Sequence, residues 1–317
     1  MVRFTVPAAA AVLAFCSQIS ATPVKARQEE LVHPIGFDAS FALRVPADAP
    51  VPRVQTLRVD ELVQNATETP GFTPGGGGGA AAAAAEAGEL GRRFIIGADD
   101  RRLWNDPNYP FIAVGRLQWS NGVFCSGAMI GPRHFLTARH CHVDGVPGIF
   151  APGYDNGARY GQAQLTNVLF TTGQEPGSPC ETKGDWAVYA LDQRLGERTG
   201  YFGARLPDPG MLDRPQFYHI GYPGDKDGGS RPYRQTDITI HSKPRTFDCD
   251  STGPVWTDAD VMGGQSGGPL WELDGNGNRW IWGALSVGVQ SSTEGYSGFA
   301  SGNGMVDGIV YMRNQFP

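Results

Sequence analysis

The chain has 317 residues, a length that fits one or two domains of ordinary size. Its 26 basic and 32 acidic side chains give a formal net charge of −6, so the chain lacks the positive excess that binds nucleic acid or anionic lipid. We therefore expect neither nucleic acid nor a membrane surface as a partner.

The first residues have the organisation of a secretory signal peptide. Arg3 supplies a charged head, an apolar run covers residues 8–15, and small residues lead up to Ala21. This run is shorter than the ~20 apolar residues that cross a bilayer, and no later stretch reaches that length. The sequence therefore predicts a signal peptide over residues 1–21 and a secreted, extracellular protein without a membrane anchor.

Four cysteines remain after removal of the signal peptide, because Cys16 lies within it. They are Cys125, Cys141, Cys180 and Cys249. An even number of cysteines in an oxidising compartment predicts two disulfides. Four cysteines allow three pairings, and the residues alone do not choose among them.

Residues 22–93 have the character of a prosegment. A mixed, Pro-rich part extends to Glu61, and residues 74–85 are glycines followed by alanines, a composition that forms a linker rather than a core. The pair Arg92 and Arg93 follows this linker, where a processing protease can reach it. We expect cleavage after Arg93; the alternative is an ordinary charged pair on a surface.

The pattern of the sequence changes after Phe94. Short apolar runs at 111–117, 168–171, 186–191 and 280–289 alternate with clusters of Gly, Pro, Asp and Asn, which is the pattern of antiparallel strands. A helical apolar period occurs only near the end, over 306–316. The sequence predicts one all-β domain over 94–317, a sandwich or barrel.

Ser266 lies in a glycine-rich turn over residues 263–269. Without side chains in the way, backbone N–H groups of such a turn can converge beside the hydroxyl, as stabilisation of an oxyanion requires. By itself, a glycine-rich turn with one serine is more often a plain hairpin turn.

A nucleophilic serine needs a base, and the base needs an orienting carboxylate. An apolar strand at 135–138 leads directly to His140, and Cys141 then anchors it. Asp185 stands at the head of the apolar run 186–191, where burial is costly unless a partner such as a His N–H neutralises it. The alternative for Asp185 is a solvated turn cap. The other histidines lack this anchoring, and we expect each to be a surface or core residue: His134, His142, His219 and His241. His33 is expected to leave with the prosegment.

Together these segments resemble the chymotrypsin-type serine peptidases, where the order is His, Asp, Ser. The segments 96–101, 109–111, 129–132, 200–203 and 221–226 look like the glutamyl endopeptidase, or V8-like, branch in particular. The resemblance implies an all-β fold of two packed antiparallel β-barrels, to which we add a short C-terminal helix. It places His and Asp on the first barrel, Ser on the second, and substrate in the crevice between them.

The resemblance also implies a role for each residue of the site. His140 takes the proton of Ser266, Ser266 attacks a peptide carbonyl, and Asp185 holds the imidazole and stabilises its charge. The N–H groups of Gly264 and Ser266 receive the oxyanion. Cys125 and Cys141 are implied to be paired, which leaves Cys180 with Cys249 by subtraction.

Two departures from the family pattern affect activation and specificity. Gln265 stands where most chymotrypsin-type enzymes carry an Asp that receives the new N-terminus, so we expect the prosegment to cover the cleft or assist folding instead. Leu285 and Val261 occupy the positions that bind a substrate Glu in the branch, and neither can hydrogen-bond a carboxylate, so strict Glu preference should be lost.

The rest of the substrate pocket leaves two specificities open. Asp260 falls where trypsin-like enzymes keep the acid that binds Lys or Arg, which suggests a basic P1 residue (the residue whose carbonyl is attacked). The alternative is a small or apolar P1. Ser286 and Gly288 match the strand that lines the pocket and pairs with substrate backbone.

We expect a secreted monomeric serine endopeptidase that acts on proteins or peptides without a cofactor or metal. Residues 274–278 look like the start of a calcium loop, but Arg279 replaces the glycine that such a loop requires, which favours a hairpin turn. The competing hypothesis is a non-catalytic secreted binding protein on a peptidase scaffold.

Overall fold

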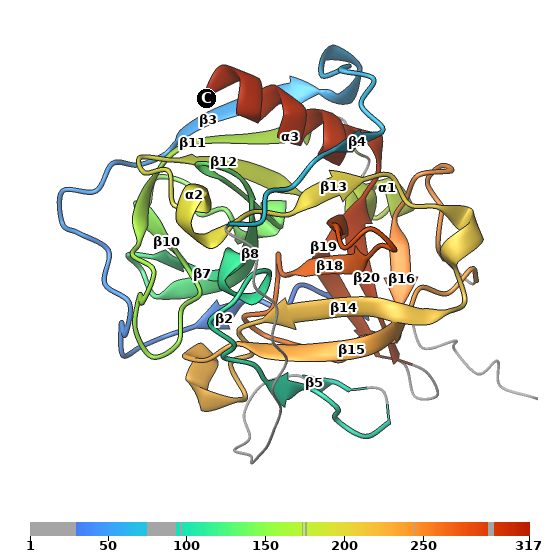
Figure 1. Ribbon diagram of the computed structural model, residues 1–317, viewed down its shortest axis with the longest axis horizontal. Helices are drawn as coiled ribbons and strands as arrows, with labels where there is room; N and C mark the ends of the chain where they lie inside the picture. The colour runs from blue at the N-terminus through green and yellow to red at the C-terminus, as the bar shows by residue number, and fades with distance from the viewer. Residues whose placement is uncertain are drawn as a thin grey trace, which may run out of the picture.

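Figure 1 shows the computed structural model of the protein, which describes residues 30–74, 93–95, 97–172, 174, 176–243, 245–290 and 295–317. The predicted signal peptide, most of the predicted Gly/Ala linker and Arg92 lie outside these residues. No helix within the described ranges is both long and apolar enough to cross a membrane.

Six antiparallel strands form the first barrel. The barrel closes because β10 pairs with β7 on one side and with β11 on the other. Its interior is filled by stacked aromatic rings, with Phe135 lying 4.0 Å from Phe150 and 5.0 Å from Tyr189 between ring centroids. In sheet order the strands are β7 (Val114–Trp119), β8 (Val123–Gly131), β9 (His134–Thr137), β12 (Ala187–Leu191), β11 (Ala163–Thr172) and β10 (Gly148–Pro152).

A second sheet, with its own hydrophobic core around Phe217, Trp282 and Phe299, packs beside the barrel (Figure 1). β13 (Gly203–Arg205) joins it in parallel to β19, and β17 (Val261–Met262) pairs separately with β5 (Arg93–Phe94). Residues 274–278 form the predicted hairpin turn between β18 and β19. The main path of the sheet runs β16 (Val255–Thr257), β20 (Gly295–Ser301), β19 (Arg279–Gln290), β18 (Pro269–Leu273), β14 (Pro215–Gly221), β15 (Tyr233–Thr239) and β6 (Arg102–Leu103).

The predicted C-terminal helix is present as α3 (Asn303–Gln315), and Met305, Ile309 and Met312 bury its apolar face. Phe111 begins a short 3-10 helix rather than the predicted strand, because its N–H donates to Asn108 and turns the chain. The remaining helices are brief and were not predicted: α1 (Pro179–Gly184), α2 (Gly196–Thr199), η1 (Val59–Glu61), η2 (Phe111–Ala113), η3 (Arg139–Cys141), η4 (Pro209–Met211) and η5 (Asp227–Gly229).

Residues 30–74, which fall in the predicted prosegment, run over both halves of the molecule as an extended belt. β1 (Glu30–Val32) pairs with β19 and β2 (Gly36–Phe37) with β8. β3 (Arg53–Arg58) pairs in parallel with β11, and β4 (Glu68–Thr69) pairs with β13 (Figure 1). The four strands give the belt backbone hydrogen bonds to both sheets.

Candidate active site

Three side chains from separate parts of the chain meet where the two halves of the molecule face each other. Asp185 Oδ2 lies 2.6 Å from His140 Nδ1, and His140 Nε2 lies 2.7 Å from Ser266 Oγ. His140 lies in η3 directly after β9, Asp185 between α1 and β12, and Ser266 in the turn between β17 and β18. This is the arrangement in which a hydroxyl can pass its proton to an oriented imidazole.

Asp185 is buried, with 7 % of its surface exposed, and every contact on its carboxylate stabilises the charge. The backbone N–H of His140 donates to Oδ1 at 2.9 Å, and the hydroxyl of Ser286 donates to Oδ2 at 2.6 Å. Burial alone would raise the pKa of Asp185, but the interactions with His140 and Ser286 outweigh it and lower the pKa. The carboxylate is therefore ionised and holds Nδ1 of the imidazole as an N–H donor.

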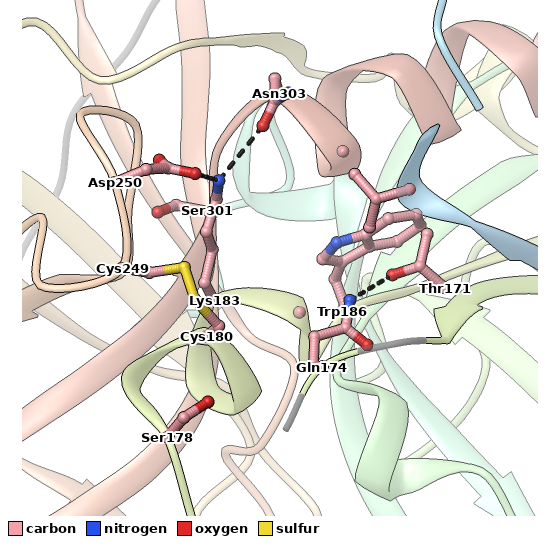
Figure 2. Close-up of a pocket in the computed structure, with 13 residues that line it drawn as sticks. Thr171, Gln174, Ser178, Cys180, Lys183, Trp186, Cys249, Asp250, Ser301 and Asn303 are labelled. Carbon is pink, nitrogen blue, oxygen red and sulfur yellow. Dashed lines mark hydrogen bonds and ion pairs between the residues drawn. A yellow bond between two sulfur atoms is a disulfide. The ribbon is translucent and has the colours of Figure 1, made fainter. Parts of the chain in front are cut away.

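The helix α1 fixes the approach of the chain to Asp185. The Cys180–Cys249 disulfide ties α1 to the segment before β16. In Figure 2, Lys183 reaches from the same helix to Asp250 and Asn303. The second disulfide joins Cys125 to Cys141, next to His140. The Cys125–Cys141 pairing is the one implied by the resemblance, and Cys180–Cys249 is the one left by subtraction. Each lies next to one residue of the site.

Gly264 and Ser266 form the backbone side of the site. Gly264 has φ = 98°, and a Cβ there would come within 2.4 Å of the Phe124 ring and of the Tyr222 carbonyl oxygen. Only glycine fits this turn. The N–H groups of Gly264 and Ser266 both point at the carbonyl oxygen of Pro34, at 2.6 and 3.4 Å. The two predicted oxyanion donors thus converge on one carbonyl.

That carbonyl belongs to the belt, which is paired as a strand on either side of the site and turns at Pro34 between the two strands. Val32 pairs with Gly288, the residue expected to pair with substrate backbone, and Gly36 pairs with Phe124 on the other side of Ser266. Between them, the carbonyl of Pro34 lies where an attacked carbonyl would lie.

His33 contacts the site directly, which the sequence did not indicate. Its ring stacks on His140 with 4.2 Å between centroids, and its Nδ1 donates to the carbonyl oxygen of Ser286 at 3.0 Å. We expected His33 to leave with the prosegment, and nothing in the local sequence points to its contact with His140. The register of β1 against β19 produces that contact.

The other histidines do not reach Ser266. His134 and His219 are fully buried, and burial lowers the pKa of each to about 4, so both are neutral core residues. His142 bonds the hydroxyl of Tyr189. Arg139, beside the catalytic histidine candidate, donates to the carbonyl of Thr171.

The sequence profile of the trypsin family matches residues 105–305. The chain belongs to the trypsin family. The glutamyl endopeptidase of Bacillus licheniformis is 33 % identical over 187 residues, which are 56 % of this chain and 54 % of that protein. The chain thus spans about half the length of this curated relative. A solved Glu endopeptidase in complex with MPD covers 70 % of this chain and 100 % of its own, with a TM-score of 0.57 and 23 % identity, and supports the fold.

This trypsin-family chain has an uncharged residue before its serine, and the structure supplies a partner for it. Gln265 Oε1 accepts a hydrogen bond from Arg101 Nη1 at 3.0 Å. The same guanidinium pairs with Asp225 at 2.7 Å and with Asp99 at 2.9 Å. An internal arginine therefore braces the turn between Gly264 and Ser266.

The predicted pocket residues lie below the site in a largely apolar setting. Val261 pairs with Phe94, and both are buried with Leu285 in the second core. A Cβ on Gly288 would lie 2.5 Å from the Phe94 ring. Asp260 is 1 % exposed, and its carboxylate accepts the backbone N–H of Asp100 at 3.2 Å. The sequence did not single out Phe94 as a pocket residue.

Proposed function

We propose that this protein is a secreted serine endopeptidase, made as a proenzyme, that hydrolyses peptide bonds through an acyl-enzyme on Ser266. The observation that carries the proposal is the continuous chain of contacts from Asp185 through His140 to the Ser266 hydroxyl. His140 takes the hydroxyl proton as Ser266 attacks, and later donates it to the leaving amine. Asp185 stabilises the imidazolium that forms between these steps.

The negative oxygen that develops on the attacked carbonyl is received by the N–H groups of Gly264 and Ser266. Their convergence on the Pro34 carbonyl supports this assignment. Fixed donors of this kind stabilise the charge without having to reorganise, and removal of one typically costs about 100-fold or more in rate.

The belt is the inhibitory part of the proenzyme. It enters the site as a peptide substrate would, but Pro34 has no N–H, and the carbonyl of Ser286 is bonded by the His33 ring instead. The N–H of Ile35 donates to the His33 carbonyl at 2.9 Å and makes a tight turn at Pro34. This turn favours a bound inhibitor over a cleaved substrate.

We propose that cleavage after Arg93 separates the prosegment from residues 94–317 without opening the site by itself. The belt keeps its pairing with β19, β8, β11 and β13 after such a cut. Activation therefore requires the cut prosegment to dissociate or be degraded. Intact-mass analysis of the secreted protein tests this order: the 94–317 fragment should copurify with an inhibitory N-terminal fragment.

A small or apolar P1 residue fits the pocket better than a basic one. Pro34 occupies the P1 position and is buried there, Phe94 lies against Gly288, and Asp260 is engaged by backbone. An unpaired Lys or Arg charge in such a pocket would be costly.

The test of the function is digestion of a random peptide library by the fully processed protein, read by mass spectrometry. Ser266→Ala protein, processed in the same way, is the matched control. Cleavage after small or apolar residues, seen only with Ser266 present, supports both proposals. If neither fully processed protein cleaves any peptide, the peptidase proposal is overturned and the binding-protein alternative is favoured.

A further inference from the structure

A buried arginine lies beside the primed side of the site, where the part of a substrate after the cleaved bond would run. Arg116, on β7, has a fully buried side chain. Its Nη1 donates to the carbonyl of Gly229 at 2.8 Å and its Nη2 to Gln118 Oε1 at 2.8 Å. The guanidinium lies 4.1 Å from the centroid of the Phe124 ring. All of these partners belong to residues 94–317, so the domain itself orients the guanidinium.

The negative partner of this cation comes from the belt. Asp38 Oδ2 accepts a hydrogen bond from Arg116 Nη2 at 2.6 Å, and among the described residues no other carboxylate forms an ion pair with Arg116. The carboxylate is also capped by the N–H and hydroxyl of Ser40. When the prosegment leaves, the domain therefore loses the counter-ion of a buried charge.

The position of Asp38 follows from the register of the belt. The carbonyl of Pro34 defines P1, so Gly36 is P2′ and Asp38 is P4′. Gly36 and Phe37 pair with β8, and the N–H of Asp38 continues this pairing by donating to the Gly122 carbonyl at 2.8 Å. An extended substrate that follows the same strand places its P4′ side chain at Arg116.

We propose that Arg116 forms a carboxylate-binding subsite in the processed enzyme and selects peptides with an acidic residue four positions after the cleaved bond. This inference rests on the proposed peptidase function. The bonds to Gly229 and Gln118 keep the guanidinium oriented without the belt, and a substrate carboxylate at P4′ restores the pair that Asp38 made. Asp should be preferred over Glu, because Asp38 reaches Arg116 with a short side chain.

The test uses the fully processed enzyme, freed of its prosegment, and a set of peptides that share the best cleaved sequence and differ only at P4′: Asp, Glu, Asn, Ala or Lys. Hydrogen bonds to charged groups contribute about 1.5–3 kcal/mol. We therefore expect kcat/KM for the Asp peptide to exceed that for the Asn peptide roughly tenfold or more. The Lys peptide should be the poorest.

Two variants locate the preference. Arg116→Met removes the cation but risks the fold, so the second variant is Gln118→Glu, which gives Arg116 an internal carboxylate at the place where Gln118 Oε1 already contacts it. In this variant the Asp/Asn ratio of kcat/KM should fall to near one. Arg214→Met, at an exposed residue just before β14, is the matched control and should keep the wild-type ratio.

The outcomes separate this inference from the function on which it rests. If the wild-type enzyme cleaves all P4′ peptides at the same bond with equal kcat/KM, the subsite is refuted while the peptidase stands; Asp38 then serves only to hold the prosegment. A preference for Asp that survives in Gln118→Glu would also overturn the role of Arg116. If no peptide is cleaved, the proposed function fails, and the subsite with it.

Discussion

The hydrogen bond from Arg101 to Gln265, in the turn that carries Ser266, gives a specific prediction for Arg101. The side chain is 2 % exposed, and its guanidinium makes five hydrogen bonds, two to Asp99, two to Asp225 and one to Gln265. Arg101→Met removes them together and leaves the buried carboxylate of Asp225 without its guanidinium. Breaking a buried pair from one side typically costs about 3–5 kcal/mol. Activity should fall as well, because Gln265 lies between the two oxyanion donors.

Urea unfolding of the full chain measures the loss of stability, in a Ser266→Ala background that guards against self-digestion. Arg102→Met is the matched control: this side chain is exposed and donates to the backbone carbonyl of Asp99, so its effect should stay within about 0.5 kcal/mol. In the active background we expect kcat of Arg101→Met to fall by roughly tenfold or more. Equal unfolding midpoints for the two variants would refute the argument.

Ser286→Ala removes the hydroxyl that donates to Asp185, and since hydrogen bonds to charged groups contribute about 1.5–3 kcal/mol, kcat should fall roughly ten- to a hundredfold with little change in KM. Unchanged peptide hydrolysis would contradict this. Burial raises the pKa of the Asp38 carboxyl, but the Ser40 hydroxyl and the Arg116 guanidinium outweigh burial and lower this pKa. The contribution of Asp38 to prosegment binding is therefore complete above about pH 4 and is lost as the pH falls through the lowered pKa. Fluorescence titration of the catalytically inert enzyme with a peptide of residues 30–52 should show weaker binding in acid, and Asp38→Asn should abolish that component. Replacement of both Cys180 and Cys249 by Ala should destabilise the proenzyme by about 2–5 kcal/mol, read as a lower Tm, and an unchanged Tm would count against the bracing role of this disulfide.

The strands of the domain could be predicted because each carries its own local pattern. The runs at 168–171 and 280–289 fall inside β11 and β19, and the run at 186–191 begins one residue before β12. Phe111 was placed in a strand wrongly, because a backbone turn from Asn108 overrides its apolar character. The short helices α1 and α2 were missed since they are too brief to show a helical period.

The residues of the site could be selected for a similar reason. Acyl transfer needs a particular set of groups, and Ser266, His140 and Asp185 each stand in a recognisable setting of glycine turn, strand end and strand start. Their spacing of 2.6 and 2.7 Å depends on the packing of the two halves of the molecule. Arg101 could not be identified in this way, because its role depends on a contact 164 residues away along the chain.

What the sequence determined by itself was the chemistry: which groups are available, which segments form strands, and that residues 22–93 differ in character from the rest. Only the tertiary structure decided where the N-terminal segment lies. The stacking of His33 on His140, the contact of Pro34 with the oxyanion donors and the pairing of Asp38 with Arg116 join residues 78 or more positions apart. Such contacts leave no local periodicity, because they depend on the register of one strand against another, and a register is fixed only when both strands are in place.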